Sequence, residues 1–259
     1  MVKRSSFQIF LAVQNALFLR ELSMRFSEGR MGLFWTFVEP FFQILIFIVI
    51  KVALFSSAQN DFDFSVFLAL NFIAFNLFKN IVTKSSNAFE ANKALFTFKQ
   101  VKPIDTIIAR LIVEVFITAI ITCIFIVIGL YFDFDMDIQD LSMVSLGFIF
   151  LLFFSFSFAL VISIMNVFIS SVGKLLSFLM TGLMFGSAVF YPIKGLPTEI
   201  QNFLLYNPLT HFLEMIHCFY FVALDDEYIS YHYMLVWTLS LCYIGLWLYS
   251  KFEKKIISL

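Results

Sequence analysis

Charged residues are scarce in this chain: Asp, Glu, Lys and Arg make up 14% of its 259 residues, against roughly 25% in soluble domains. Hydrophobic residues make up 61%, and the mean hydropathy is +0.93. A soluble domain of this length would not tolerate so much apolar surface, so the composition indicates an integral membrane protein. The charges behind its net −1 are sorted along the chain rather than pooled, and no nucleic-acid partner is expected.

Cysteine and catalytic motifs are lacking too. Cys123, Cys218 and Cys242 show neither a CxxC pair nor the spacing of a metal site. No G-x-x-x-x-G-K-[ST] motif occurs, because Gly173-Lys174 is not followed by Ser or Thr, so the chain cannot bind ATP in that way. HExxH and GxSxG are missing as well. We therefore expect no catalytic residue, no metal ligand and no cofactor in this chain.

Long apolar runs fill most of the sequence. A helix of about 20 apolar residues crosses the hydrocarbon core of a bilayer, and hydropathy predicts six such spans. The predicted fold is an all-α integral membrane protein in which residues 33–259 form one six-span domain. The spans are about Leu33–Phe55, Phe64–Val82, Ile104–Tyr131, Leu141–Ile169, Leu175–Tyr191 and Tyr233–Ser250.

The stretch between the fifth and last spans, Pro192–His232, has intermediate hydrophobicity. Pro197, Pro208 and the acidic residues 225–227 break it too often for a plain span. We expect a re-entrant segment of two short half-helices that dip into the bilayer. Such irregular backbone is tolerated at membrane depth only when it is buried in protein or lines a cavity.

Residues 1–32 precede the first span and predict an amphipathic helix lying in the cytosolic interface. Glu21 and Arg25 intrude on its apolar side, and an ordinary juxtamembrane anchor is the alternative. The apolar side consists of Phe7, Phe10, Leu11, Leu17, Phe18 and Leu22.

Two carboxylates fall inside predicted spans. Glu39 is followed by Pro40, and a charge at that depth is expected to face a protein interior or a water-filled path. The proline frees a backbone carbonyl that neighbouring helices or water must satisfy. Glu114 lies four residues after Arg110, so we expect these two to pair on one helix face, and structural pairing is favoured over a proton relay.

Charge asymmetry sets the predicted orientation. Lys and Arg precede the first span, crowd the loop between the second and third, and end the chain, whereas the alternate loops are acidic and contain only Lys194 as a basic residue. Basic residues mark the cytoplasmic side, so both termini are predicted to be cytoplasmic. The acidic residues of the outer loops are Asp61, Asp63, Asp133, Asp135, Asp137, Asp140, Asp225, Asp226 and Glu227.

The largest cytosolic connection, Lys79–Pro103, predicts a short helix with Phe89, Lys93 and Phe96 along one side. We expect the two Phe residues to protrude and to dock into a groove of a partner. The alternative is a solvated basic loop near anionic headgroups.

Five motifs, in order and spacing around the spans, carry a resemblance to a known family over nearly the whole length. The chain resembles the membrane subunits of type-2 ABC exporters, in the branch that exports capsular polysaccharide, O-antigen and teichoic acid. It is most similar to the capsule-export permeases of Gram-negative bacteria. The motifs are L-x-x-R-E-L-x-x-R-F at Leu17–Phe26, G-R-M-G-L-F-W-T-F-V-E-P at Gly29–Pro40, N-K-A-L-F-T-F-K-Q-V-K-P at Asn92–Pro103, S-A-V-F-Y-P at Ser187–Pro192 and Y-N-P-L-T-H-F-L-E at Tyr206–Glu214.

The resemblance implies partners and a location. It implies a homodimer in the bacterial inner membrane that binds two cytosolic P-loop ATPase subunits, which hold the ATP and Mg. It also implies a lipid-linked polysaccharide as cargo, together with periplasmic and outer-membrane export proteins.

The resemblance also implies roles for particular positions. The interfacial helix and first cytosolic loop of the family contact the ATPase, and the segment before the last span closes the outer end of the pathway. Aromatic faces along the channel suit sugar rings, which present apolar C–H faces. The candidates are Arg20, Arg25, Arg30, Phe89, Lys93 and Phe96 for coupling to the ATPase, Phe34, Trp35, Glu39, Phe41 and Phe42 for the substrate path, and Tyr191, Asn207, Pro208, His211 and Glu214 for the periplasmic gate.

Other function classes remain as alternatives. An ABC exporter could carry O-antigen or another substrate, and a proton-coupled secondary transporter could use Glu39 or Glu114, although hydropathy shows no inverted repeat. A membrane acyl- or glycosyltransferase would need a carboxylate–histidine set. His211 and Glu214 lie three residues apart on one helix face, where capping or gate structure is the favoured interpretation. A neighbouring reading frame for a P-loop ATPase would separate these classes.

Overall fold

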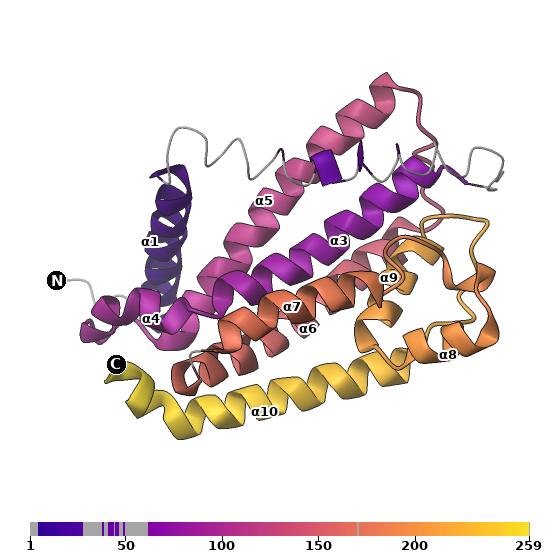
Figure 1. The fold of residues 1–259 in the computed structure, drawn as a ribbon. Helices are drawn as coiled ribbons and strands as arrows, with labels where there is room; N and C mark the ends of the chain where they lie inside the picture. The colour runs from indigo at the N-terminus through magenta and orange to yellow at the C-terminus, as the bar shows by residue number, and fades with distance from the viewer. Residues whose placement is uncertain are drawn as a thin grey trace.

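A computed structural model describes residues 5–27, 38, 41–43, 45–46, 49, 62–169 and 171–258. All regular secondary structure in these residues is helical, which confirms the all-α class (Figure 1). Arg30, Phe34, Trp35 and Glu39 lie outside them, as does most of the predicted first span. The count of six spans therefore stays a prediction.

Four helices of the described residues are long and apolar enough to cross a membrane. They match the second, third, fourth and last predicted spans. The fifth corresponds to α7, Val172–Phe185, whose 14 residues give about 21 Å of helix against roughly 30 Å of hydrocarbon. The four long helices are α3 (Phe64–Ser85), α5 (Pro103–Tyr131), α6 (Leu141–Phe168) and α10 (Tyr231–Ile257).

Helix α3 is the most buried of these spans and packs against α5 and α6 (Figure 1). Its Phe67, Phe72 and Phe75 have no exposed surface. Asn71 and Asn76 are buried as well. The amides that soften the hydropathy of α3 thus face protein, where polar side chains find interhelical partners.

Helix α5, by contrast, exposes an apolar face along its C-terminal half. Phe116, Ile124, Val127 and Leu130 are 44% to 66% exposed. Lipid tails are as apolar as these side chains, so such a face suits a span at the edge of a bundle. The surface of α5 therefore supports its assignment as a membrane helix.

Helix α1, Ser6–Ser27, packs its middle against α5. Val13 and Leu17 are buried there with Ala109, and the rings of Phe18 and Phe116 lie 5.7 Å apart in an edge-to-face contact. Phe7, Phe10 and Leu11, predicted to share one face with Leu17, are exposed. The residues of the predicted apolar side are therefore partly buried and partly exposed, because the side of α1 that meets α5 is mixed in polarity. The location of α1 in a membrane interface stays a prediction.

The remaining elements are short. Two follow α3, namely α4 (Ala88–Asn92) and the 3-10 helix η1 (Lys93–Thr97). Three follow α7, namely the 3-10 helix η2 (Ile193–Gly195), α8 (Thr198–Leu205) and α9 (Pro208–Cys218). Every residue of α9 from Leu209 to Cys218 is buried, against α3, α6 and α10.

Candidate functional site

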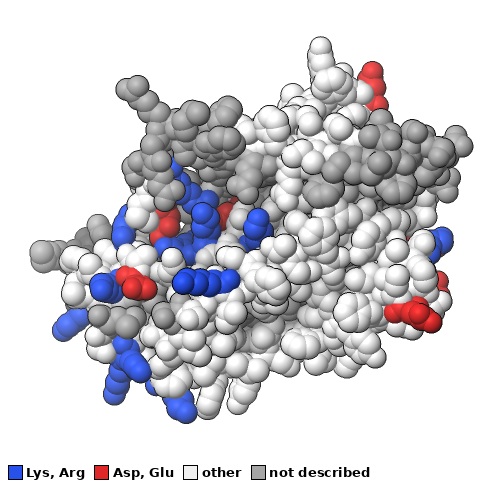
Figure 2. All heavy atoms as spheres, in the orientation of Figure 1, with Lys and Arg blue, Asp and Glu red and all other residues white. Residues whose placement is uncertain are grey.

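The two ends of the molecule differ in charge. Figure 2 shows most Lys and Arg side chains at the end formed by α1, α4 and the last turns of α10, with a few acidic side chains among them. At the opposite end the charged side chains are mostly acidic. The start of α1 and the end of α10 both lie at the basic end (Figure 1). The charges that alternate along the sequence are thus sorted in space, and the functional elements fall into a basic end and an acidic end.

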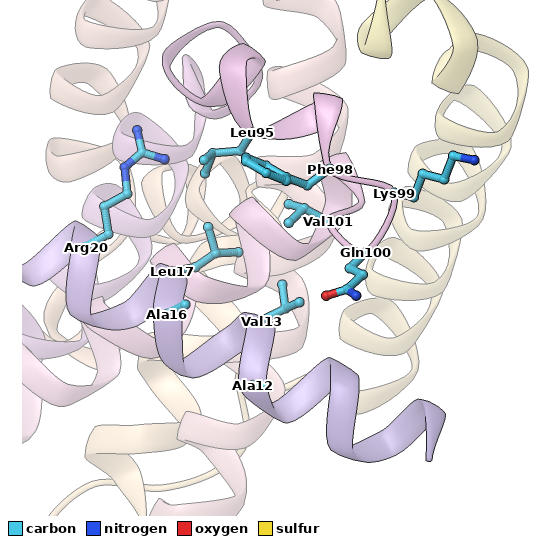
Figure 3. A pocket seen from close by; sticks show the side chains of 10 residues that line it. All are labelled: Ala12, Val13, Ala16, Leu17, Arg20, Leu95, Phe98, Lys99, Gln100 and Val101. Atoms are coloured by element: carbon cyan, nitrogen blue, oxygen red, sulfur yellow. The ribbon is translucent and has the colours of Figure 1, made fainter. Parts of the chain in front are cut away.

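A groove of about 480 Å³ opens at the basic end, between α1 and the segment that follows η1. The side chains that α1 places at the groove are partly small, which makes room for it, and apolar side chains form its walls. Figure 3 shows Leu17, Leu95, Phe98 and Val101 turned toward one another, with Arg20 at one edge. The lining residues are Ala12, Val13, Ala16, Leu17, Arg20, Leu95, Phe98, Lys99, Gln100 and Val101.

The predicted protrusion of Phe89 and Phe96 is wrong. Phe89 is 1% exposed and Phe96 is 6% exposed, and both belong to the main hydrophobic core. Burying such a ring gains about 1.5–3 kcal/mol, so the short helix turns these rings inward. Lys93 and Phe98 remain exposed, and Phe98 is 62% exposed. We did not single out Phe98 from the sequence, although it lies two residues after Phe96 in the same motif.

The two described coupling arginines, Arg20 and Arg25, bind within the chain. Nη1 of Arg20 donates to Oδ1 of Asn92 over 2.7 Å, and Arg25 pairs with Glu114. Arg110 pairs with Glu21, its Nε lying 3.2 Å from Oε1. The predicted pairing of Arg110 with Glu114 on one helix face is therefore wrong, because α1 supplies each of them with a partner.

At the acidic end, Asn207 and Pro208 start α9. The Asn207 side chain accepts the N–H of Leu209 over 3.1 Å, while its Nδ2 donates to the Gly186 carbonyl and to Oγ of Ser187, each over 2.8 Å. Pro208 occupies the first turn, where a missing N–H costs nothing. Asn207 thereby joins α9 to the end of α7.

His211 and Tyr191 bind backbone carbonyls in the same region. Nε2 of His211 lies 3.0 Å from the Leu205 carbonyl, and Nδ1 lies 3.1 Å from that of Tyr228. The hydroxyl of Tyr191 donates to the Phe185 carbonyl over 2.8 Å. His211 thus links α9 to the end of α8 and to the segment before α10, and Tyr191 bonds the end of α7.

Glu214 does not pair with His211. Its Oε2 lies 2.9 Å from Nε2 of His217, three residues later. Neither atom has a hydrogen-bond partner among the described residues, so the contact is a close approach rather than an aligned hydrogen bond. Nδ1 of His217 donates to Oδ1 of Asn71 in α3 over 2.9 Å. His217 was not among the predicted site residues, although its i, i+3 spacing from Glu214 was a signal.

Phe41 and Phe42 are the described members of the predicted substrate path. They are 39% and 54% exposed, and their rings meet edge to face at 6.3 Å. The neighbouring Gln43 accepts a hydrogen bond from Asn76 over 3.4 Å and donates to the sulfur of Met184 over 3.5 Å. Gln43 is therefore an interhelical hydrogen-bonding residue, and Phe41 and Phe42 are left open on the surface.

Comparison with known proteins gives a consistent result. The sequence profile of the ABC-2 type transporter family matches residues 14–221. Polysialic acid transport protein KpsM of Escherichia coli is 32% identical over 98% of this chain and 99% of its own length. Capsule polysaccharide export inner-membrane protein BexB of Haemophilus influenzae is 27% identical over 97% and 96%. The similarity thus runs from α1 through α9 and on to α10.

Proposed function

Because this chain belongs to the ABC-2 type transporter family, we propose that it is the membrane subunit of an ATP-driven exporter of lipid-linked capsular polysaccharide. The observation that carries the proposal is the similarity over almost the full length to proteins named for polysialic acid transport and capsule polysaccharide export. The chain is a permease subunit, and its sequence has no ATP-binding motif of its own. Cargo movement therefore needs energy from a partner.

The partner is a cytosolic ATPase subunit that binds ATP and Mg, two copies of which meet a homodimer of this chain. Its docking surface is the basic end, where the groove between α1 and the loop after η1 is lined by apolar side chains with Arg20 and Lys99 at its edges. Phe98 and Lys93 are the exposed side chains of the loop. An apolar partner side chain flanked by carboxylates would complement this surface.

The orientation follows from the charges. Basic side chains at the end where α1 begins and α10 finishes support an inner-membrane protein whose termini are cytoplasmic. The short α7 and the buried α9 support a re-entrant segment at the periplasmic end, because irregular backbone survives at membrane depth when protein covers it. The first predicted span, at about Leu33–Phe55, completes the six spans of the proposal.

The substrate path runs between the two protomers. Phe41 and Phe42, together with Phe34, Trp35 and Glu39, supply aromatic faces and one carboxylate for sugar rings. α9 and its anchors Tyr191, Asn207, His211 and Glu214 form the gate at the periplasmic end, beyond which export proteins of the periplasm and outer membrane receive the polymer. The ion pair of Glu114 with Arg25 supports a structural role for that carboxylate rather than a proton relay.

Reconstitution tests the proposal. The chain is purified with its cognate ATPase and placed in vesicles with a lipid-linked capsular polysaccharide. We expect cargo to accumulate across the membrane only with ATP and Mg, and not when the P-loop Lys of the ATPase is replaced. Transport driven by a proton gradient without ATP would identify a secondary transporter instead. Transport of an O-antigen glycan in place of the capsular polymer would correct the cargo.

A further inference from the structure

Helices α1 and α5 are joined by two crossed ion pairs. α1 carries Glu21 and Arg25, and α5 carries Arg110 and Glu114, so each helix has one acid and one base four residues apart. Glu21 pairs with Arg110, and Arg25 pairs with Glu114. The side chains of Glu21 and Arg110 are 10% and 9% exposed, that of Glu114 is 1% exposed, and that of Arg25 is 16% exposed.

Opposite charges at i, i+4 normally stabilise their own helix. Here each charge reaches instead for the other helix, in a location where removing either partner would leave a buried charge uncompensated. Arg110 and Glu114 lie seven and eleven residues into α5, about 10 and 16 Å along a predicted span. Charges at such depth are tolerated when they are paired, so each of these side chains needs its partner on the other helix.

The alternation of sign also sets the register of the two helices. Sliding α1 by one turn in one direction would bring Arg25 opposite Arg110. Sliding it in the other direction would bring Glu21 opposite Glu114. Either slip replaces two attractive contacts with a repulsive one, and one-turn slips are the steps by which packed helices change position. An apolar contact of the same area would not exclude them.

Further bonds tie the same unit together. Arg110 donates to the carbonyl of Lys84, at the end of α3. Arg20 donates to Asn92, at the end of α4, and Nε2 of Gln14 donates to the carbonyl of Asp105 over 3.3 Å. α1 is therefore bonded to α5 at several points and to the end of α4, which directly precedes η1.

We propose that the crossed pairs are positioning contacts that make α1 and α5 move as one body. In this proposal, which rests on the proposed function, a push delivered to the groove by the ATPase reaches the membrane-embedded part of α5 without slippage. Glu21, Arg25, Arg110 and Glu114 transmit motion and need not contact cargo or nucleotide. The ion pair of Arg25 and Glu114 is the better one to test. Arg110, in the other pair, also donates to a backbone carbonyl, so its replacement would remove two contacts at once.

Charge reversal provides that test. Arg25→Glu, Glu114→Arg and the double variant are compared in vesicles with the ATPase bound, and cargo moved per ATP hydrolysed is measured. We expect each single variant to lose at least about fivefold in this ratio, the low end of allosteric coupling, while the ATPase still co-purifies. The double variant should recover to within about twofold. Asp137→Arg, an exposed charge reversal in the loop between α5 and α6 and outside the proposed docking surface, is the control and should keep the wild-type ratio.

A merely structural role would lower the amount of folded complex without changing the ratio per complex. A wild-type ratio in both single variants, or no recovery in the double variant, would therefore overturn the proposal. If a reversal prevents membrane insertion, Arg25→Gln, Glu114→Gln and their double variant give the same cycle with smaller perturbations.

A second measurement is independent of the exporter assignment. Spin labels are placed at Asn15 of α1 and Ile112 of α5, which are both exposed, after the native Cys residues are replaced. The distance distribution should be narrow in the wild type, broad in each single variant and narrow again in the double variant. Failure of ATP-driven export with this pattern intact would reject the proposed function alone. Equal distance distributions in all variants would reject the proposal that the ion pairs hold α1 and α5 together.

Discussion

His217 in α9 and Asn71 in α3 meet inside the protein, with 2.9 Å between the ring Nδ1 and the amide Oδ1, although 146 residues separate them in the chain. Neither side chain has exposed surface. An amide oxygen only accepts, so Nδ1 carries the proton. The ring of Phe67 covers the imidazole at a centroid distance of 4.9 Å. This bond holds the buried helix of the acidic end, α9, against the central span α3.

Removing the Asn71 amide should therefore loosen α9. In Asn71→Leu the His217 N–H is left without its acceptor, and an unsatisfied buried donor costs about 1–3 kcal/mol. We expect a lower unfolding temperature of the detergent-solubilised protein. Asn202→Leu, at an exposed position of α8, is the matched control and should leave the temperature unchanged. Equal temperatures for wild type and Asn71→Leu would show that the bond adds nothing.

Gly147 of α6 allows α9 to approach closely. A Cβ at this position would lie 2.9 Å from Cγ1 of Ile216 and 3.5 Å from Cγ of Met215. Gly147→Ala should destabilise the protein by about 1–3 kcal/mol, as overpacking does. Gly182→Ala in α7, where a Cβ meets no described atom within 4 Å, is the control. Thermal unfolding of the two variants compares them, and equal stability would contradict the close approach.

Phe98 is expected to contact the ATPase. Truncating a side chain that anchors an interface costs about 2–4 kcal/mol of binding. Phe98→Ala should therefore release the ATPase in detergent pull-downs while the yield of folded protein stays normal. Phe89→Ala, which removes a core ring, should cost about 3–5 kcal/mol of stability and lower the yield instead. Undiminished co-purification with Phe98→Ala would remove this residue from the interface.

The orientation predicts which side of the membrane two exposed residues reach. After replacement of the native Cys residues, a cysteine at Asp135 should react with an impermeant thiol reagent in intact cells whose outer membrane has been permeabilised. A cysteine at Lys93 should react only after the inner membrane is opened. Both positions are exposed in the structure, so burial within the protein would not prevent the reagent from reaching them. The reverse labelling pattern would overturn the topology.

Glu39 separates the exporter from a proton-coupled transporter. Gln keeps one carbonyl acceptor and nearly the same shape, whereas Leu leaves any hydrogen-bond donors unpaired at about 1–3 kcal/mol each. We expect Glu39→Gln to retain substantial export and Glu39→Leu to lose most of it, with both variants still binding the ATPase. At constant ATP, an uncoupler should leave wild-type transport in vesicles largely intact. Collapse of transport under that condition would favour proton coupling.

The sequence alone determined the class of the protein. The apolar runs predicted the all-α membrane fold and the four long helices of the described residues. They do so because, in lipid, backbone polar groups must be hydrogen-bonded within the segment, as a helix allows. The order of charges predicted two ends of different polarity, which the structure has, since loops of one sign stay on one side. The motifs indicated the family, which the comparison confirms.

Only the tertiary structure decided which groups meet. Helical spacing says that Arg110 and Glu114 share a face, but not that α1 arrives with the complementary charges and takes both. Likewise, Phe89 and Phe96 were assigned to one side of a short helix, yet which side faces the core depends on how α4 packs against α5 and α6. Periodicity is a local property with a range of a few residues, whereas the partners of Glu114 and His217 lie 89 and 146 residues away. Packing between helices settles such pairs, because buried charges and amides must find a partner wherever the fold supplies one.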